Sequence, residues 1–174
     1  METEEKKKTE IEQAGEDLLN FAIDREDIKW LVSTLPEETD SMKRSKVEYE
    51  LQLLKIISVG WSIPYFLENS PGKDQLMGLF WESVQEFSNG LSETTTLMTG
   101  QDIDYFQVLK NRLDMYVNAM SEKSGEKEPV SVIGPEFAGA CGDGDDIFVL
   151  MTGTKMFSAA VDGVREYLTA IKMI

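Results

Sequence analysis

Apolar residues recur at alternating intervals of three and four in five separate segments of this sequence. Such spacing places the apolar side chains along one stripe of an α-helix, and this stripe must be buried against neighbouring elements. We therefore predict an all-α fold, a single-domain bundle of about five helices over residues 1–174. The last segment repeats most regularly, at Ile147, Leu150, Thr154, Phe157, Val161, Val164, Leu168 and Ile171.

The second segment runs from about Met42 to Asn69 and is apolar on several faces, which is typical of a central helix covered by neighbours. Because proline lacks the amide hydrogen and clashes with the preceding turn, we expect this helix to be kinked at Pro64. The first segment is interrupted only by Arg25 and is expected to continue as one helix up to Pro36.

Three polar or glycine-rich stretches are expected to lie outside the helices. Residues 1–8 are predicted to be frayed and residues 121–129 to form a mobile linker. Residues 130–144 are rich in glycine and are predicted to be an ordered loop packed on the bundle. Because the apolar residues near both ends of 130–151 have strand propensity, a small β-hairpin within this range is the alternative.

The charge is strongly unbalanced, with 17 basic and 32 acidic residues and a net charge of −15. Such a charge repels phosphate backbones and anionic lipid headgroups, so we expect no nucleic-acid partner and no membrane partner. It favours a basic protein partner. The lone Cys141 excludes an intrachain disulfide and favours a reducing compartment. Since residues 1–13 lack the apolar stretch of a secretory signal, we expect a cytoplasmic location.

The sequence contains no histidine. This excludes Ser-His-Asp and Cys-His catalysis, His-ligated zinc and iron sites, and the usual proton shuttle near neutral pH. Chemistry in this chain would depend on carboxylates, Lys, Tyr or Cys141. We identify no catalytic residues and expect no cofactor.

Asp143, Asp145 and Asp146 lie in a glycine-rich turn and are the first candidates for ligands of a divalent metal, because Ca²⁺ and Mg²⁺ prefer oxygen ligands. The EF-hand pattern fails here, since the twelfth position is Thr154 rather than glutamate. The favoured interpretation is a helix cap with additional acids at the positive end of the helix dipole.

Glu82 and Glu86 are one helical turn apart and are the second metal candidates. All-α nucleotide pyrophosphohydrolases hold Mg²⁺ or Mn²⁺ with E-E-x-x-E on one helix and E-x-x-D on the next. Residues 37–40 fit the second half by spacing, but they lie in a predicted linker, and no E-E-x-x-E occurs in the chain.

Trp61, Tyr65 and Trp81 are candidates for the lining of an apolar pocket. A helix kinked at Pro64 leaves backbone carbonyls without partners, and the gap beside it must be filled by a loop, water or a ligand. The alternative is that these aromatic residues only pack in the core.

The last helix mixes small residues with its large apolar ones, which allows another helix to approach closely. Gly153, Phe157, Ala160 and Val164 form this candidate helix-packing face. Its partner is either another helix of the same chain or a second copy across a two-fold axis.

These features support three hypotheses about function. The first is a non-catalytic cytoplasmic helical protein that serves as a protein-interaction or structural module. The second is a carboxylate-based hydrolase that depends on Mg²⁺ or Mn²⁺. The third is a small-molecule sensor with an apolar pocket near Pro64.

Overall fold

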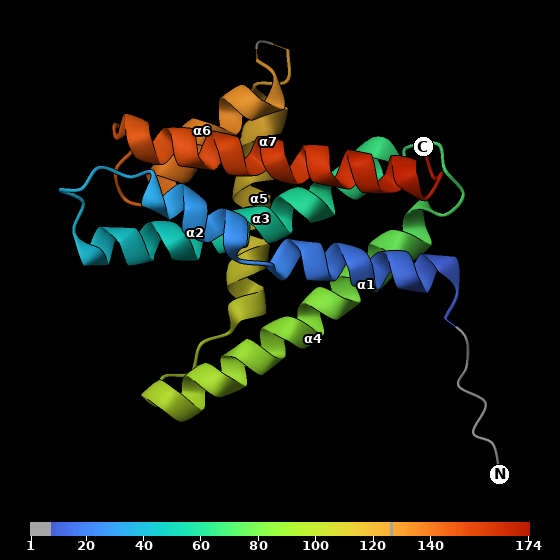
Figure 1. The fold of residues 1–174 in the computed structure, drawn as a ribbon, viewed down its shortest axis with the longest axis horizontal. Helices are drawn as coiled ribbons and strands as arrows, with labels where there is room; N and C mark the ends of the chain where they lie inside the picture. The colour runs from blue at the N-terminus through green and yellow to red at the C-terminus, as the bar shows by residue number, and fades with distance from the viewer. Residues whose placement is uncertain (1–7, 126) are drawn as a thin grey trace.

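The computed structural model describes residues 8–125 and 127–174, and all the regular structure in them is α-helical (Figure 1). The predicted all-α bundle is confirmed, and the hairpin alternative is not supported, because residues 129–140 and 147–151 are helical. The helices are α1 (Glu10–Ile23), α2 (Glu26–Ser33), α3 (Ser41–Phe66), α4 (Lys73–Thr99), α5 (Tyr105–Glu122), α6 (Pro129–Ala140) and α7 (Ile147–Ala170).

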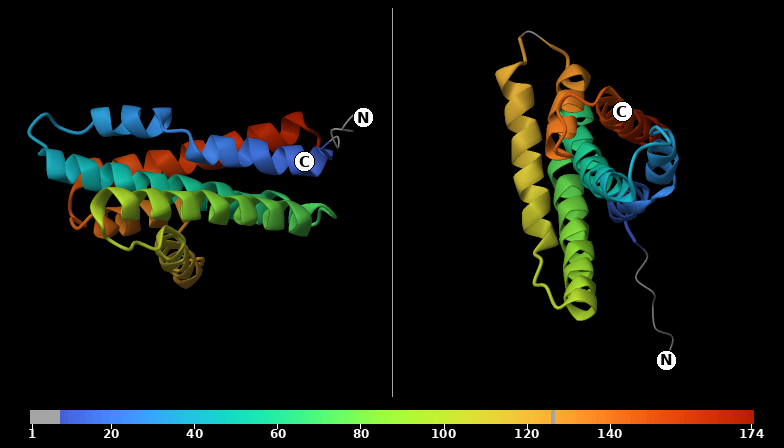
Figure 2. Two further views of the ribbon diagram at one scale, coloured as in Figure 1. Left: turned by 90° about the horizontal axis from the view of Figure 1, so that it is seen from below. Right: turned by 90° about the vertical axis from the view of Figure 1, so that its left-hand side faces the viewer.

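Helix α3 forms the centre of the bundle and contacts all six other helices. The two views in Figure 2 show the other helices arranged around it. Its side chains are buried almost continuously from Glu50 to Gly60, as expected for a helix apolar on several faces. Pro64 lies inside the last turn, and the helix continues to Phe66. The proline therefore marks the end of α3 rather than dividing it.

The first predicted helix is two helices, α1 and α2, and the expectation of one continuous helix is wrong. The break lies at Asp24, whose backbone is extended, and at Arg25, the residue that interrupts the apolar stripe. The Asp24 carbonyl accepts a hydrogen bond from the buried Lys55 Nζ at 2.9 Å. Arg25 donates to Gln52 at 3.2 Å, so polar groups of α3 stabilise the break.

The glycine-rich segment 130–144 is mostly helix α6, so the prediction of a packed loop is wrong for residues 130–140. Its small residues serve helix packing instead. A Cβ on Gly134 would lie 2.3 Å from the Thr154 hydroxyl of α7, so only glycine permits this approach. Helix α5 extends to Glu122, which shortens the predicted linker to residues 123–128, and residue 126 lies outside the described residues.

The prediction of frayed residues 1–8 falls outside the described residues except for Lys8, which pairs with Glu16. Helix α1 then begins with a capping box, in which the Thr9 hydroxyl accepts from the Glu12 amide and the Glu12 carboxylate accepts from the Thr9 amide.

Helix α7 packs on α2, α3 and α6. Within the described residues it is the one helix whose length and composition would allow it to cross a membrane, with a mean hydropathy of 1.3 over its most apolar window. Core helices of bundles have the same composition, and 39% of that window is buried in this bundle.

Helices α1 and α7 run in opposite directions along one side of the bundle. The start of α1, the turn between α3 and α4, and the end of α7 consequently meet at one end of the molecule, on the right-hand side of Figure 1. We name this the terminal end of the bundle.

Candidate ligand-binding pocket

A hollow with a volume of about 710 Å³ lies at the terminal end of the bundle. Three segments that are far apart in the sequence form it, namely the first two turns of α1, the α3–α4 turn and the residues around the end of α7. We name it the terminal pocket. Its lining residues are Glu10, Ile11, Gln13, Asp17, Ser70, Pro71, Gly72, Tyr167, Ile171, Lys172 and Met173.

The end of α7 is shaped by a Schellman motif. Lys172 has a left-handed backbone with φ of 60°, the Met173 amide donates to the Leu168 carbonyl at 2.9 Å, and the Lys172 amide donates to the Thr169 carbonyl at 3.0 Å. This reversal directs the chain back toward the α3–α4 turn. A Cβ on Gly72 would lie 3.2 Å from Met173 Cε and 3.5 Å from Ile11 Cδ1, so the three segments converge at Gly72.

The polar wall of the terminal pocket centres on Asp17. The Tyr167 hydroxyl donates to Asp17 Oδ2 at 2.7 Å, and the Gln13 amide donates to Oδ1 at 2.9 Å. These hydrogen bonds, that of Tyr167 first, lower the pKa of the Asp17 carboxyl. Burial, with a further contribution from the same carboxylate, raises the pKa of Tyr167. Asp17 is therefore ionised and Tyr167 is protonated at neutral pH.

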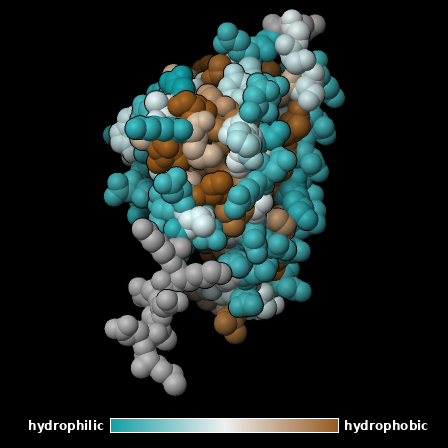
Figure 3. All heavy atoms as spheres, turned by 90° about the vertical axis from the view of Figure 1, so that its right-hand side faces the viewer, coloured by the Kyte–Doolittle hydropathy of each residue, from teal (hydrophilic) through white to brown (hydrophobic). Residues whose placement is uncertain are grey.

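The apolar wall consists of Ile11, Pro71, Ile171 and Met173. Figure 3 views the right-hand side of the molecule, where hydrophobic residues reach the surface between hydrophilic ones. Ile171 and Ile174 are 39% and 46% exposed at this end of the molecule. The pocket thus combines an apolar surface with a few convergent polar groups.

The structure separates the three aromatic residues that were predicted to line one pocket. Trp61 and Tyr65 stack at 4.7 Å between ring centroids and line an open hollow of about 690 Å³ with Pro64, Glu68 and Lys73. Trp81 instead lines a small apolar hollow of about 240 Å³ with residues of α5. The expected location beside Pro64 is therefore hollowed, but without Trp81.

Two of the weak metal-ligand candidates lie together, but around a lysine of the same chain. Asp143 and Asp146 both pair with Lys43, and Asp146 caps α7 by accepting from the Phe148 and Val149 amides. Within the same turn, the backbone amide of Asp145 donates a hydrogen bond to the Asp143 carboxylate at 3.3 Å. The favoured interpretation of a helix cap is thus confirmed for Asp146.

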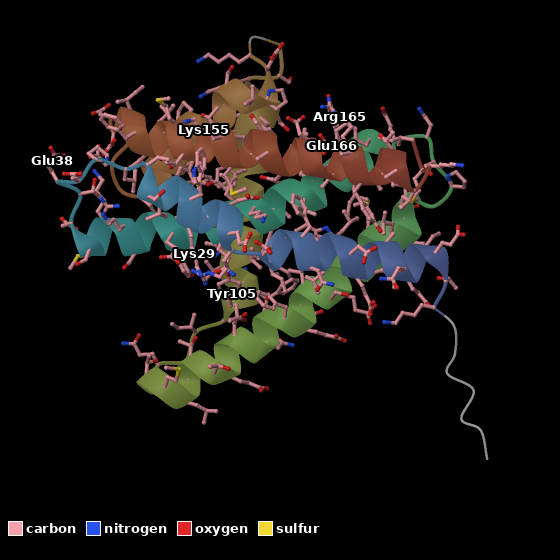
Figure 4. The ribbon with its side chains drawn as sticks, in the orientation of Figure 1. Lys29, Glu38, Tyr105, Lys155, Arg165 and Glu166 are labelled. Atoms are coloured by element: carbon pink, nitrogen blue, oxygen red, sulfur yellow. The ribbon has the colours of Figure 1, made fainter. Side chains whose placement is uncertain are left out.

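The second pair of metal candidates, Glu82 and Glu86, is exposed on α4. Figure 4 places Glu38 at the end of the molecule opposite to the α3–α4 turn, and Asp40 of the same segment caps α3 by accepting from the Lys43 amide at 2.8 Å. Among the described residues, no group of three acidic or cysteine side chains is arranged to hold a metal ion.

The candidate helix-packing face is used within the chain. Gly153, Phe157, Ala160 and Val164 are all buried. A Cβ on Gly153 would lie 2.4 Å from the ring of Phe137, which shows how closely α6 approaches α7. The intramolecular alternative therefore describes this face, which is not accessible to a second copy.

A buried ionic cluster was not anticipated. Glu50 of α3 is fully buried and accepts two hydrogen bonds from Arg112 of α5, at 2.7 and 2.9 Å, and Lys46 lies 3.3 Å from it. Burial, with the nearby negative charge of Glu50, raises the pKa of Cys141 to about 12. The sequence signal that could have indicated this cluster was Glu50 itself, an acid within a predicted helix that is apolar on several faces.

No family model, no curated protein and no solved structure matches this chain. The class of protein is consequently defined by fold and surface alone. It is an all-α bundle around a central helix, with an open amphipathic pocket at one end.

Proposed function

We propose that this chain is a non-catalytic binding module whose ligand occupies the terminal pocket. The observation that carries the proposal is the pocket itself. Its volume of about 710 Å³ is within the range of small-molecule sites, which is about 300–1,000 Å³, and it joins apolar walls to a few oriented polar groups. The proposal combines the sensor hypothesis with the binding-module hypothesis, and it places the ligand in the terminal pocket instead of beside Pro64.

Chemical arguments support a role without catalysis. The chain has no histidine, and Cys141 has a pKa of about 12, so its thiolate is scarce at neutral pH. The acidic residues considered for a metal-dependent hydrolase are dispersed or engaged with Lys43 in the described structure. The hydrolase alternative therefore has no supporting geometry.

The proposal retains a cytoplasmic location without nucleic-acid or membrane partners. Its support is the charge of −15 and the single cysteine of the sequence.

Filling the terminal pocket provides a direct test. Gly72 has an ordinary φ of −85°, and a side chain there would project toward Ile11 and Met173. We expect Gly72→Phe to abolish the binding of small molecules that a ligand-observed NMR screen of the wild-type chain detects. Gly78→Phe is the matched control, because a Cβ on Gly78 meets no atom within 4 Å. The proposal is wrong if Gly72→Phe binds the same molecules as the wild type.

A protein partner is the second candidate function, favoured by the first two turns of α7. Ile147, Phe148 and Met151 are 58%, 51% and 45% exposed and lie on one face of the helix. Because exposed apolar groups of this kind mark interaction sites, we expect Ile147→Ser/Phe148→Ser to lose proteins that co-purify with the wild type. An unchanged set of co-purifying proteins would count against this surface.

A further inference from the structure

Given the proposed binding function of the terminal pocket, we infer that its ligand is an amphipathic organic cation. An ammonium group would lie against Asp17, and an apolar body would lie against Ile11, Pro71 and Met173.

The first step concerns the charge of Asp17. Its carboxylate is ionised, and its hydrogen-bond donors among the described residues are both neutral, the Tyr167 hydroxyl and the Gln13 amide. An ionised carboxylate has about four acceptor positions, so two remain for a ligand. None of the ion pairs in the described structure includes Asp17. A cationic donor would supply the countercharge that Asp17 lacks among the described residues.

The second step concerns the sign of the remaining charges. Glu10 lines the same pocket, and among the described lining residues the one base is Lys172, which is exposed on the Schellman turn. These described residues have a net charge of −1, from two acids and one base, within a chain of net charge −15. This field attracts cations and repels anionic ligands. The ring of Tyr167 adds an aromatic surface, which favours an ammonium group further.

The third step concerns the remainder of the ligand. A bare metal ion would leave the apolar walls in contact with water, and the described residues hold no group of three metal-binding side chains. The walls formed by Ile11, Pro71, Ile171 and Met173 favour hydrocarbon, and the thioether of Met173 is flexible enough to adapt to its shape. A primary amine with a hydrocarbon body satisfies both walls.

The experiment compares hexylamine, hexanol and hexanoate at constant ionic strength by amide chemical shifts of the ¹⁵N-labelled chain. We expect hexylamine to shift the amides of Gln13, Gly72 and Tyr167 and to bind about tenfold more tightly than hexanol, because a charge-assisted hydrogen bond is about twice as strong as a neutral one. Hexanoate is expected not to bind.

Two substitutions separate charge from structure. Asp17→Asn retains an acceptor for Tyr167 but removes the charge, and it should weaken hexylamine binding about tenfold, to the level of hexanol. Tyr167→Phe removes the hydrogen bond but keeps the charge, and it should preserve most of the affinity. Asp162→Asn is the control for general electrostatics, since Asp162 is an exposed acid of α7 that pairs with Arg165 outside the pocket.

The outcomes distinguish this inference from the proposed function. If hexanol binds as tightly as hexylamine and Asp17→Asn has no effect, the pocket binds ligands but the preference for cations is wrong. If Asp162→Asn weakens binding as much as Asp17→Asn, the attraction is general and the inference is also wrong. If none of the three compounds shifts the pocket amides, both the inference and the pocket as a binding site are overturned.

Discussion

At the scale of single residues, burial determines the chemistry of Cys141. Its pKa of about 12 means that the folded chain holds the thiol proton more tightly than the unfolded chain, whose cysteine titrates near about 8.5. The contribution of this thiol to stability is therefore fully present below about pH 8.5 and is lost as the pH rises toward 12.

We predict that Cys141 of the native chain reacts with Ellman's reagent at pH 8 on the order of a hundredfold more slowly than in the chain unfolded by guanidinium, because both the thiolate fraction and access are reduced. The native rate should still be rising at pH 10. Time courses of absorbance measure both rates. Equal rates in native and unfolded chains would contradict the burial of this thiol.

Glu50 is a fully buried acid that accepts two hydrogen bonds from Arg112. We predict that Glu50→Gln lowers the free energy of unfolding by about 2–3 kcal/mol, because it leaves Arg112 without its bidentate acceptor. The loss is expected at the lower end of the range for buried pairs, since the Arg112 side chain is 26% exposed and can reach water. Urea unfolding measures the change.

Glu48→Gln is the matched control for this experiment, because Glu48 lies in the same helix and pairs with Arg25 near the surface. Its neutralisation should cost less than about 1 kcal/mol. Similar unfolding midpoints for the two variants would show that the buried cluster contributes no more than a surface pair.

At the scale of helices, the close approach of α6 to α7 depends on Gly153, which has no side chain. We predict that Gly153→Ala destabilises the chain by about 1–3 kcal/mol, because the new Cβ would lie 2.4–2.7 Å from Phe137, which is itself fully buried. Gly78→Ala in α4 meets no atom within 4 Å and should stabilise the chain by up to about 1 kcal/mol. Thermal unfolding followed by circular dichroism compares them, and destabilisation of both variants alike would contradict the packing argument.

Local patterns predict helices well where one face is buried over many turns. The central position of α3 and the Asp146 cap of α7 follow from such patterns. Helix α6 does not, because its glycines and prolines resemble those of a loop, and only the close approach of α7 explains them. The break after α1 likewise depends on Lys55, which is 31 residues away from Asp24 in the sequence.

The terminal pocket could not be predicted either, because it also depends on contacts between segments that are distant in the sequence. Its walls come from residues 10–17, 70–72 and 167–173, and none of these segments contains a recognisable motif. Asp17 and Tyr167 meet across 150 positions of the sequence. The apolar pattern of one helix contains no information about such a pairing. In the same way, the placement of Trp81 and Trp61 in different hollows depends on how α3 and α4 pack against each other.

At the scale of the whole molecule, several basic residues form ion pairs within the chain. Arg25, Lys43, Lys46, Lys55 and Arg112 all pair with acids on other turns or helices. With 32 acids against 17 bases, the acids far outnumber the bases that could neutralise them. Repulsion among the acids opposes the compact state and is screened by salt.

We therefore predict that raising NaCl from about 10 to 200 mM, which shortens the Debye length from about 30 to about 7 Å, increases the melting temperature by a few degrees. The buried pair of Glu50 and Arg112 is screened little and should remain intact. Differential scanning fluorimetry measures the shift, with sucrose as a control for general co-solvent effects. A melting temperature that falls with salt would mean that attraction within surface ion pairs outweighs the repulsion, and the excess acids would then contribute little to the energetics of the fold.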